Sequence, residues 1–182
     1  MKNLFMIILG CNLPNRFTEQ HDVFFGISDT LADLKQNMID FWPETNGRMH
    51  IDSYRIVRKV GAYEICIVDK DKDHVKNDLN LYFLNLGGYK PSDMEEYHYK
   101  QLVVAKSMSE AISIAKQNTF WKHHESSHVD NKYGIDVDDA YLVEDMLPSE
   151  VRSNYSIQII PNSELVEEER VVVGYLKLDK LK

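Results

Sequence analysis

The chain has 182 residues, of which 43% are hydrophobic and 27% charged, and its formal net charge is −8. This composition is typical of a folded globular protein and excludes a fibrous or largely disordered chain. The acidic balance argues against nucleic acid and against an anionic membrane surface as partners. No apolar run approaches the roughly 20 residues that a membrane-spanning helix needs.

The first residues, MKNLFMIILGC, resemble either a lipoprotein signal ending at Cys11 or a buried strand. The apolar stretch is shorter than the roughly 7–15 residues of a secretory signal, and a similar stretch recurs inside the chain. We therefore predict a strand over residues 1–9 and a mature chain that begins at Met1 or Lys2. Cys11 and Cys66 show no metal-binding spacing, so we expect two free thiols in the cytoplasm.

The stretch LFMIILGCNLPNRFTEQH recurs as LYFLNLGGYKPSDMEEYH at a constant spacing of 77 positions. The identical pairs are Leu4 and Leu81, Gly10 and Gly87, Pro14 and Pro91, Glu19 and Glu96, and His21 and His98. Ungapped identities at irregular positions indicate a tandem duplication.

Each repeat predicts the same order of elements. A second strand over 22–27 is matched by 99–104, with Phe25 and Leu102 at equivalent core positions. A helix follows, which begins after Thr30 in the first copy and Ser107 in the second, both natural N-caps. Two strands, around 52–57 and 63–68, end the first copy, and 155–160 matches the second of them.

The order ββαββ, present twice, predicts an α+β fold built from two β-grasp-like (ubiquitin-like roll) units, each a small mixed sheet crossed by one helix. Parallel central strands in each sheet stay open at this stage. The predicted domains are 1–68 for the first repeat, 69–78 for a charged linker, 79–161 for the second repeat and 162–182 for a C-terminal extension with one strand.

Two copies of a Leu-Gly, Pro and Glu-x-His pattern are followed by a helix ending in Phe-Trp and by His-Ile-Asp or His-Val-Asp. With these motifs the chain resembles the bacterial proteins of the domain of unknown function 1543 family, over nearly its whole length to about Pro161. The resemblance implies a bacterial protein with a β-grasp-like module. It implies no activity.

The candidate site is a duplicated set of histidines and carboxylates that can exchange protons near neutral pH or hold a metal. Its members are Glu19, His21, His50 and Asp52 in the first copy, and Glu96, His98, His128 and Asp130 in the second. An insertion in the second copy also allows Asp52 to match Asp139 instead of Asp130. As the structural alternative, His21 and His98 clamp their loops; we expect this clamp, with imidazoles largely buried and hydrogen-bonded to their own backbone.

A second motif, His124-Glu125-Ser-Ser-His128, fits the H-E-x-x-H zinc pattern. Lys122 precedes it and two serines fill its centre, so a polar linker is the favoured interpretation. The run Asp69-x-Asp71-x-Asp73 lacks the glycine and glutamate of a calcium loop and is read as solvated linker.

The sequence thus favours a non-catalytic module that binds a small molecule or a protein, with no cofactor and no metal required. An acid–base or metal-dependent enzyme that uses the duplicated His and carboxylate residues is the alternative. A homodimer stays open, and no nucleic acid or membrane partner is expected.

Overall fold

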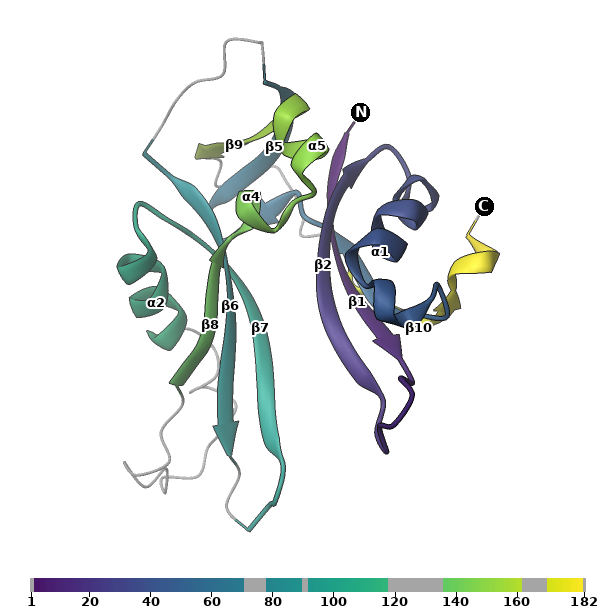
Figure 1. The fold of residues 1–182 in the computed structure, drawn as a ribbon. Helices are drawn as coiled ribbons and strands as arrows, with labels where there is room; N and C mark the ends of the chain where they lie inside the picture. The colour runs from purple at the N-terminus through teal and green to yellow at the C-terminus, as the bar shows by residue number, and fades with distance from the viewer. Residues whose placement is uncertain (1, 71–77, 90–91, 118–135, 162–169, 182) are drawn as a thin grey trace. The chain divides into compact units, whose positions relative to one another are not determined.

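The computed structural model describes residues 2–70, 78–89, 92–117, 136–161 and 170–181, and everything below concerns these residues (Figure 1). The chain is an α+β protein with mostly antiparallel strands in three sheets and few helices. It divides into two compact units. Unit 1 comprises Met1–Lys76 with Met146–Lys182, and unit 2 comprises Asn77–Asp145.

The main sheet of unit 1 has the strand order β10-β3-β1-β2, and each neighbouring pair is antiparallel. The strands are β1 (Asn3–Cys11), β2 (Gln20–Ser28), β3 (His50–Ile56) and β10 (Val172–Lys177). The continuously apolar β1 is covered on both faces, because Phe5 and Ile7 on one face and Leu4 and Met6 on the other are all buried. The strand predicted over 1–9 is therefore present, and Cys11 is its last residue.

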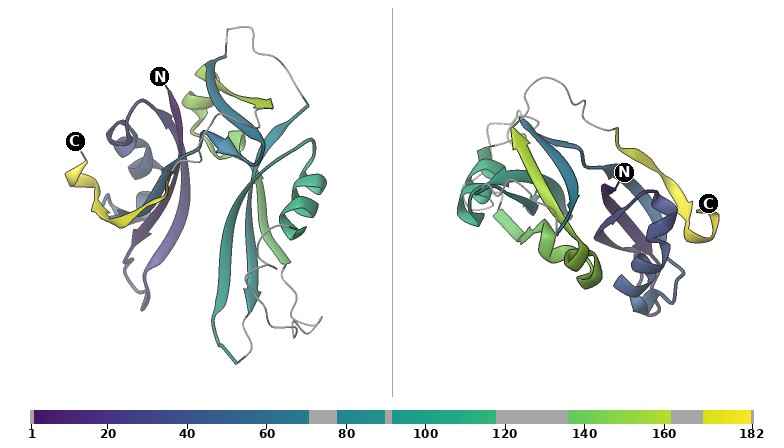
Figure 2. Two further views of the ribbon diagram at one scale, coloured as in Figure 1. Left: turned by 180° about the vertical axis from the view of Figure 1, so that it is seen from behind. Right: turned by 90° about the horizontal axis from the view of Figure 1, so that it is seen from above.

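One face of this sheet packs against a short helical segment made of η1 (Leu31–Leu34) and α1 (Lys35–Phe41), seen from two further directions in Figure 2. The segment begins at Thr30, whose backbone N–H donates to Asp33 Oδ2 at 2.9 Å, as its N-cap role predicts. The buried side chains of this core are Phe5, Ile7, Leu9, Cys11, Phe24, Leu34, Met38, Met49, Ile51 and Leu178. Alternation along β1 leaves Gly10 facing the other side of the sheet.

Unit 2 has a three-stranded antiparallel sheet in the order β7-β6-β8. Its strands are β6 (Asn80–Tyr89), β7 (Glu96–Ala105) and β8 (Asp136–Leu142), and α2 (Met108–Gln117) packs on one face. The buried residues of this core are Tyr82, Leu84, Leu86, Val103, Ala105, Ala111 and Ala115. Small alanines on α2 let the helix approach the sheet closely.

The strand pairs of the two units share one register. In unit 1 Met6 lies opposite Phe25, and in unit 2 Phe83 lies opposite Leu102, each 77 positions later. Phe25 is fully buried and Leu102 is 9% exposed. The strand order is also the same in both units, because β2-β1-β3 corresponds to β7-β6-β8. These are the positions at which the sequence predicts equivalent core residues.

The third sheet differs from the prediction of one mixed sheet in each repeat. Here β4 (Lys59–Val60) and β5 (Tyr63–Asp69) join β9 (Tyr155–Pro161), so the two matched last strands pair with each other. Ile65 and Ile159 oppose each other and are both buried, which stabilises this pairing. Every described strand pair is antiparallel, so the parallel central strands left open by the sequence are not found among the described residues.

The pairing of β5 with β9 also changes the boundaries. Unit 2 ends at Asp145, whereas the sequence placed residues 79–161 in one repeat. Most of the predicted linker, 71–77, lies outside the described residues. The predicted C-terminal strand is present as β10. The remaining helical turns are η2 (Pro43–Thr45), α4 (Val143–Met146), α5 (Ser149–Asn154) and η3 (Leu178–Lys180), and none of the described helices has the length and hydropathy to cross a membrane.

Candidate metal centre

In unit 1 two histidines lie on either side of the end of β1. Gly10 pairs with His21 on β2 and with His50 on β3, so both imidazoles flank one glycine. The next residue of β3, Ile51, points into the core, which directs His50 and Asp52 to the opposite face. Glu19 comes directly before β2 and completes the group. We call Glu19, His21, His50 and Asp52 site 1.

The donor atoms of site 1 lie at closely similar separations. His21 Nε2 is 3.6 Å from Glu19 Oε2 and 3.2 Å from Asp52 Oδ2. His50 Nε2 is 3.3 Å from Glu19 Oε1 and 3.1 Å from Asp52 Oδ1. Each carboxylate therefore faces both imidazoles, and each imidazole faces both carboxylates.

His50 is the buried member of site 1. Its side chain is 4% exposed, against 47% for His21. Its Nε2 and the Oδ2 of Asp52 are buried and have no hydrogen-bond partner of acceptable geometry. A buried polar atom without a partner costs about 1–3 kcal/mol, so an arrangement of this kind calls for an explanation. The ring of Tyr175, on β10, packs against the His50 ring, and the two ring centroids lie 4.0 Å apart.

Gly10 makes the convergence possible. A Cβ atom at this position would lie 2.6 Å from His50 Nε2 and 2.7 Å from Asp52 Oδ2. Contacts that short are essentially never seen for a real Cβ, so any side chain here would push the donors away. The glycine is needed for a close approach to the donor atoms, not for an unusual turn.

The nitrogen–oxygen separations are of the size found between ligands of one small cation, with each carboxylate presenting one oxygen to His21 and the other to His50. Zinc–nitrogen and zinc–oxygen bonds of about 2.0–2.2 Å imply tetrahedral donor–donor distances of about 3.3–3.6 Å, and octahedral ones of about 2.8–3.1 Å. The four separations of site 1, from 3.1 to 3.6 Å, fall in this span. Two imidazoles and two carboxylates are a donor set that suits divalent first-row metals.

Cys11 follows Gly10 but is not part of site 1. Its side chain belongs to the core on the helix face of the sheet. Burial raises the pKa of the Cys11 thiol, Glu19 raises it further and Arg48 opposes the shift. A neutral buried thiol is a poor metal ligand, because the thiolate is the binding form.

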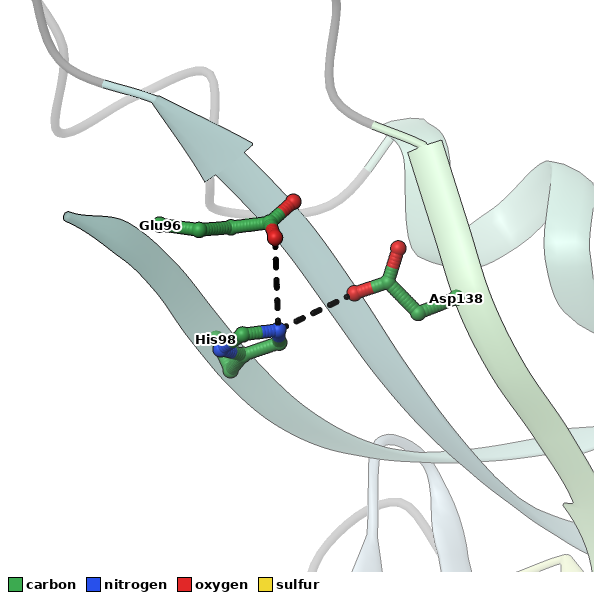
Figure 3. A group of neighbouring side chains, drawn as sticks. All are labelled: Glu96, His98 and Asp138. Carbon is green, nitrogen blue, oxygen red and sulfur yellow. Dashed lines mark ion pairs between the residues drawn. The ribbon is translucent and has the colours of Figure 1, made fainter. Parts of the chain in front are cut away.

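Unit 2 contains a related group on the equivalent strands. We call Glu96, His98 and Asp138 site 2 (Figure 3). His98 Nε2 lies 3.9 Å from Glu96 Oε2 and 3.3 Å from Asp138 Oδ2, and all three side chains are at least one-third exposed. Gly87 leaves space for the donors as Gly10 does in site 1. A Cβ at this position would overlap an Asp138 carboxylate oxygen and lie 2.8 Å from Glu96 Oε1.

The strand ladder identifies which residues of the two units correspond. Gly10 pairs with His50, and Gly87 pairs with Asp136, so Asp136 stands where His50 does. Both ladders then shift by one residue, and the extra residue is Asp52 in one unit and Asp138 in the other.

Asp138 is thus a site residue that the sequence reasoning missed. The match left open, Asp139, is one position away and instead accepts a hydrogen bond from Asn85 at 3.4 Å. The signal was an apolar residue between two polar ones, His50-Ile-Asp52 and Asp136-Val-Asp138. The same pattern in His128-Val-Asp130 drew the alignment to those residues, which lie outside the described part of the chain, as does the motif His124-Glu125-Ser-Ser-His128.

The expected loop clamp is not what the structure shows. His21 and His98 were predicted to be largely buried and bonded to their own backbone. Their side chains are 47% and 41% exposed, and both face carboxylates of their own unit. The physical reason is their place at the polar end of each hairpin, where β2 and β7 run out into solvent.

Comparison with known proteins adds a family and a fold. Residues 16–67 match the family described as Domain of Unknown Function (DUF1543). This match supports a DUF1543 domain in that segment of the chain. The matched segment contains all of site 1.

A solved structure shares the fold of this chain. The crystal structure of protein Il1583 from Idiomarina loihiensis matches it with a TM-score of 0.68 and 21% identity, over 98% of this chain and 99% of that one. At this identity the likeness concerns the fold alone. No curated protein matches the chain.

Proposed function

We propose that the protein is a metal-binding module and that site 1 holds a divalent first-row metal such as Zn²⁺. The observation that carries the proposal is His50. Its Nε2 is buried, lacks a hydrogen-bond partner and lies 3.1–3.3 Å from two carboxylate oxygens. A cation between these atoms gives each of them a partner and removes the cost of leaving them unsatisfied.

A cation also suits the charge of the group. Glu19 and Asp52 bring two carboxylates to the same two imidazoles, and like charges so close repel each other. A divalent ion neutralises both carboxylates while neutral imidazoles donate their Nε2 lone pairs. Tyr175 acts as an outer support, because stacking fixes the plane of the His50 ring.

The common register of β1–β2 and β6–β7 supports a tandem duplication, in which each unit is a variant of one β-grasp-like module. Two unpaired cysteines support a reducing compartment, the cytoplasm. The module then offers a metal-binding face in unit 1, and the partner at that face is a small molecule or a protein.

An enzyme is the second candidate, and the exposure of His21 favours it. Catalytic zinc sites have three protein ligands and a water in the fourth position; if the half-exposed His21 gave way to water, Glu19, His50 and Asp52 would hold the metal in this way. The electronic spectrum of the Co²⁺-loaded protein separates the two candidates. Bands that change on addition of azide indicate an exchangeable position and favour the enzyme, whereas unchanged bands favour a closed binding site.

The direct test uses tag-free protein stripped with a chelator and titrated with Zn²⁺ by calorimetry, with elemental analysis after dialysis. We expect stoichiometric zinc in the wild type. Loss of one ligand in His21→Ala or Asp52→Asn should weaken binding by about tenfold or more. Asp22→Asn, next to His21 but outside the group, is the matched control. Zinc affinity that is unchanged in both ligand variants would overturn the proposal.

A further inference from the structure

Site 2 repeats the geometry of site 1 with one histidine fewer. Its three ligand atoms, from Glu96, His98 and Asp138, lie within 4.8 Å of one another. Figure 3 shows the imidazole of His98 turned toward the carboxylate of Glu96, on the same strand β7, and toward that of Asp138, which comes from β8 on the other side of β6. The position of the second histidine is held by Asp136 in the strand ladder. The donors of site 2 that the structure describes are thus one imidazole and two carboxylates.

The group has the same built-in space as site 1. Gly87 provides it, as Gly10 does, because a Cβ would collide with the Asp138 carboxylate. Exposed carboxylates alone do not make a site. In unit 1, however, the corresponding residues Glu19, His21 and Asp52 lie around His50, and the buried Nε2 of His50 has no hydrogen-bond partner. In unit 2 itself, Asn85 Oδ1 is buried without a hydrogen-bond partner, on the face of β6 that Gly87 shares.

Two further differences separate the sites. The distance from His98 Nε2 to Glu96 Oε2 is 3.9 Å, longer than any of the four in site 1. Unit 1 has a fourth strand, β10, that carries Tyr175 onto His50, while the described strands of the unit 2 sheet number three. Among the described residues, site 2 therefore has one longer donor separation than site 1 and no buried imidazole such as that of His50.

We propose that site 2 is a second metal site, weaker than site 1 and less selective for zinc over harder cations such as Mn²⁺. Imidazole favours zinc and its neighbours in the first row, whereas carboxylate and water favour Mn²⁺ and Mg²⁺. Removing one imidazole and keeping two carboxylates shifts the site toward the second group. The inference rests on the proposed function for the chemistry of the ligand, but it concerns different residues.

The experiment uses the full, tag-free chain after removal of metal. It is titrated with Zn²⁺ by calorimetry and, in a separate experiment, with Mn²⁺, whose binding is monitored by electron paramagnetic resonance. We expect two zinc-binding events separated by about tenfold or more in affinity, because even an outer-shell change alters zinc affinity by about 10–100-fold. The ratio of zinc to manganese affinity should be smaller for the weaker event. A single zinc-binding event, or a weaker event with the higher zinc preference, would contradict the inference.

Variants assign each event to its residues. His98→Ala and Asp138→Asn should remove the weaker event and leave the tighter one, whereas Asp139→Asn, on the same strand, should keep both. His21→Ala should weaken the tighter event by about tenfold or more and leave the weaker one unchanged.

Three histidines in the residues 118–135 offer a competing source of metal binding. A chain in which His123, His124 and His128 are all replaced by alanine should keep both events. Loss of the weaker event in that chain, with no loss in His98→Ala, would overturn the inference while leaving the proposed function intact. If instead His21→Ala leaves the tighter event unchanged, the proposed function fails. Loss of the weaker event in His98→Ala would then still support site 2, and its persistence would contradict it.

Discussion

Replacing Gly10 by alanine tests the architecture of site 1 without removing any ligand. The added Cβ would lie 2.6 Å from His50 Nε2, while ordinary contact begins near 3.4 Å, so the nitrogen must retreat by about 0.8 Å. Asp52 Oδ2, at 2.7 Å, must retreat by nearly as much. Metal–ligand distances in well-formed sites lie within about 0.2 Å of their ideal values. Gly10→Ala should therefore weaken zinc binding by about tenfold or more, although all four donors remain.

The variant should still fold. Gly10 lies within β1 and outside the left-handed region, so an alanine adopts its backbone conformation without strain. Overlap in a packed environment costs about 1–3 kcal/mol. Loss of glycine freedom in the unfolded chain offsets about 0.4–1 kcal/mol of this. Urea denaturation of the metal-free variant measures the balance, and calorimetric titration with Zn²⁺ measures the binding.

Gly26→Ala is the matched control. A Cβ at Gly26 would lie 2.6 Å from Leu34 Cδ2, a comparable overlap in the same unit but with a core leucine. This variant should lose stability and keep its zinc affinity. A folded Gly10→Ala protein that binds zinc as tightly as the wild type would refute the reasoning, because the donors would then not need the space above the glycine.

Three further outcomes are expected. Phe25→Ala should lower the free energy of unfolding by about 3–5 kcal/mol in urea, since Phe25 is fully buried, whereas the fully exposed Phe17→Ala should change it by at most about 0.5 kcal/mol; similar losses would contradict the core assignment. Because burial raises its pKa, the Cys11 thiol should react with a disulfide reagent at pH 8 more slowly in the folded chain than in urea, and equal rates would argue against its burial. Tyr175→Ala should weaken zinc binding by about tenfold and Tyr175→Phe should restore it, because the ring stacks on His50; equal affinities of the two variants would exclude a role for the stacking.

The sequence predicted the local elements well because their signals are local. The apolar run of β1 and the N-cap at Thr30 follow from spacing within a few residues, and the equivalence of Phe25 and Leu102 follows from the constant spacing of 77 positions between the two similar stretches. The pairing of β5 with β9 could not be predicted in this way. It joins strands about 90 positions apart, and the gain from burying Ile65 against Ile159 has no signature in either strand alone.

The candidate site was predicted in part for a similar reason. Glu19, His21, His50 and Asp52 were all named from the sequence, and they come together in unit 1. The burial of His50 was not foreseen, because β10 pairs with β3 from the far end of the chain and brings Tyr175 against the His50 ring. Asp138 was missed because the insertion before β8 hides the alignment, and a one-residue bulge then moves the carboxylate by one position.

The most direct test of the central claim is anomalous diffraction from crystals of the tag-free, zinc-loaded protein, recorded at the zinc absorption edge. We predict a strong peak in unit 1, with His21 Nε2, His50 Nε2, and oxygens of Glu19 and Asp52 at about 2.0–2.2 Å from it. Absence of a peak between these four side chains, with the zinc bound elsewhere or not at all, would contradict the claim that they form a metal site.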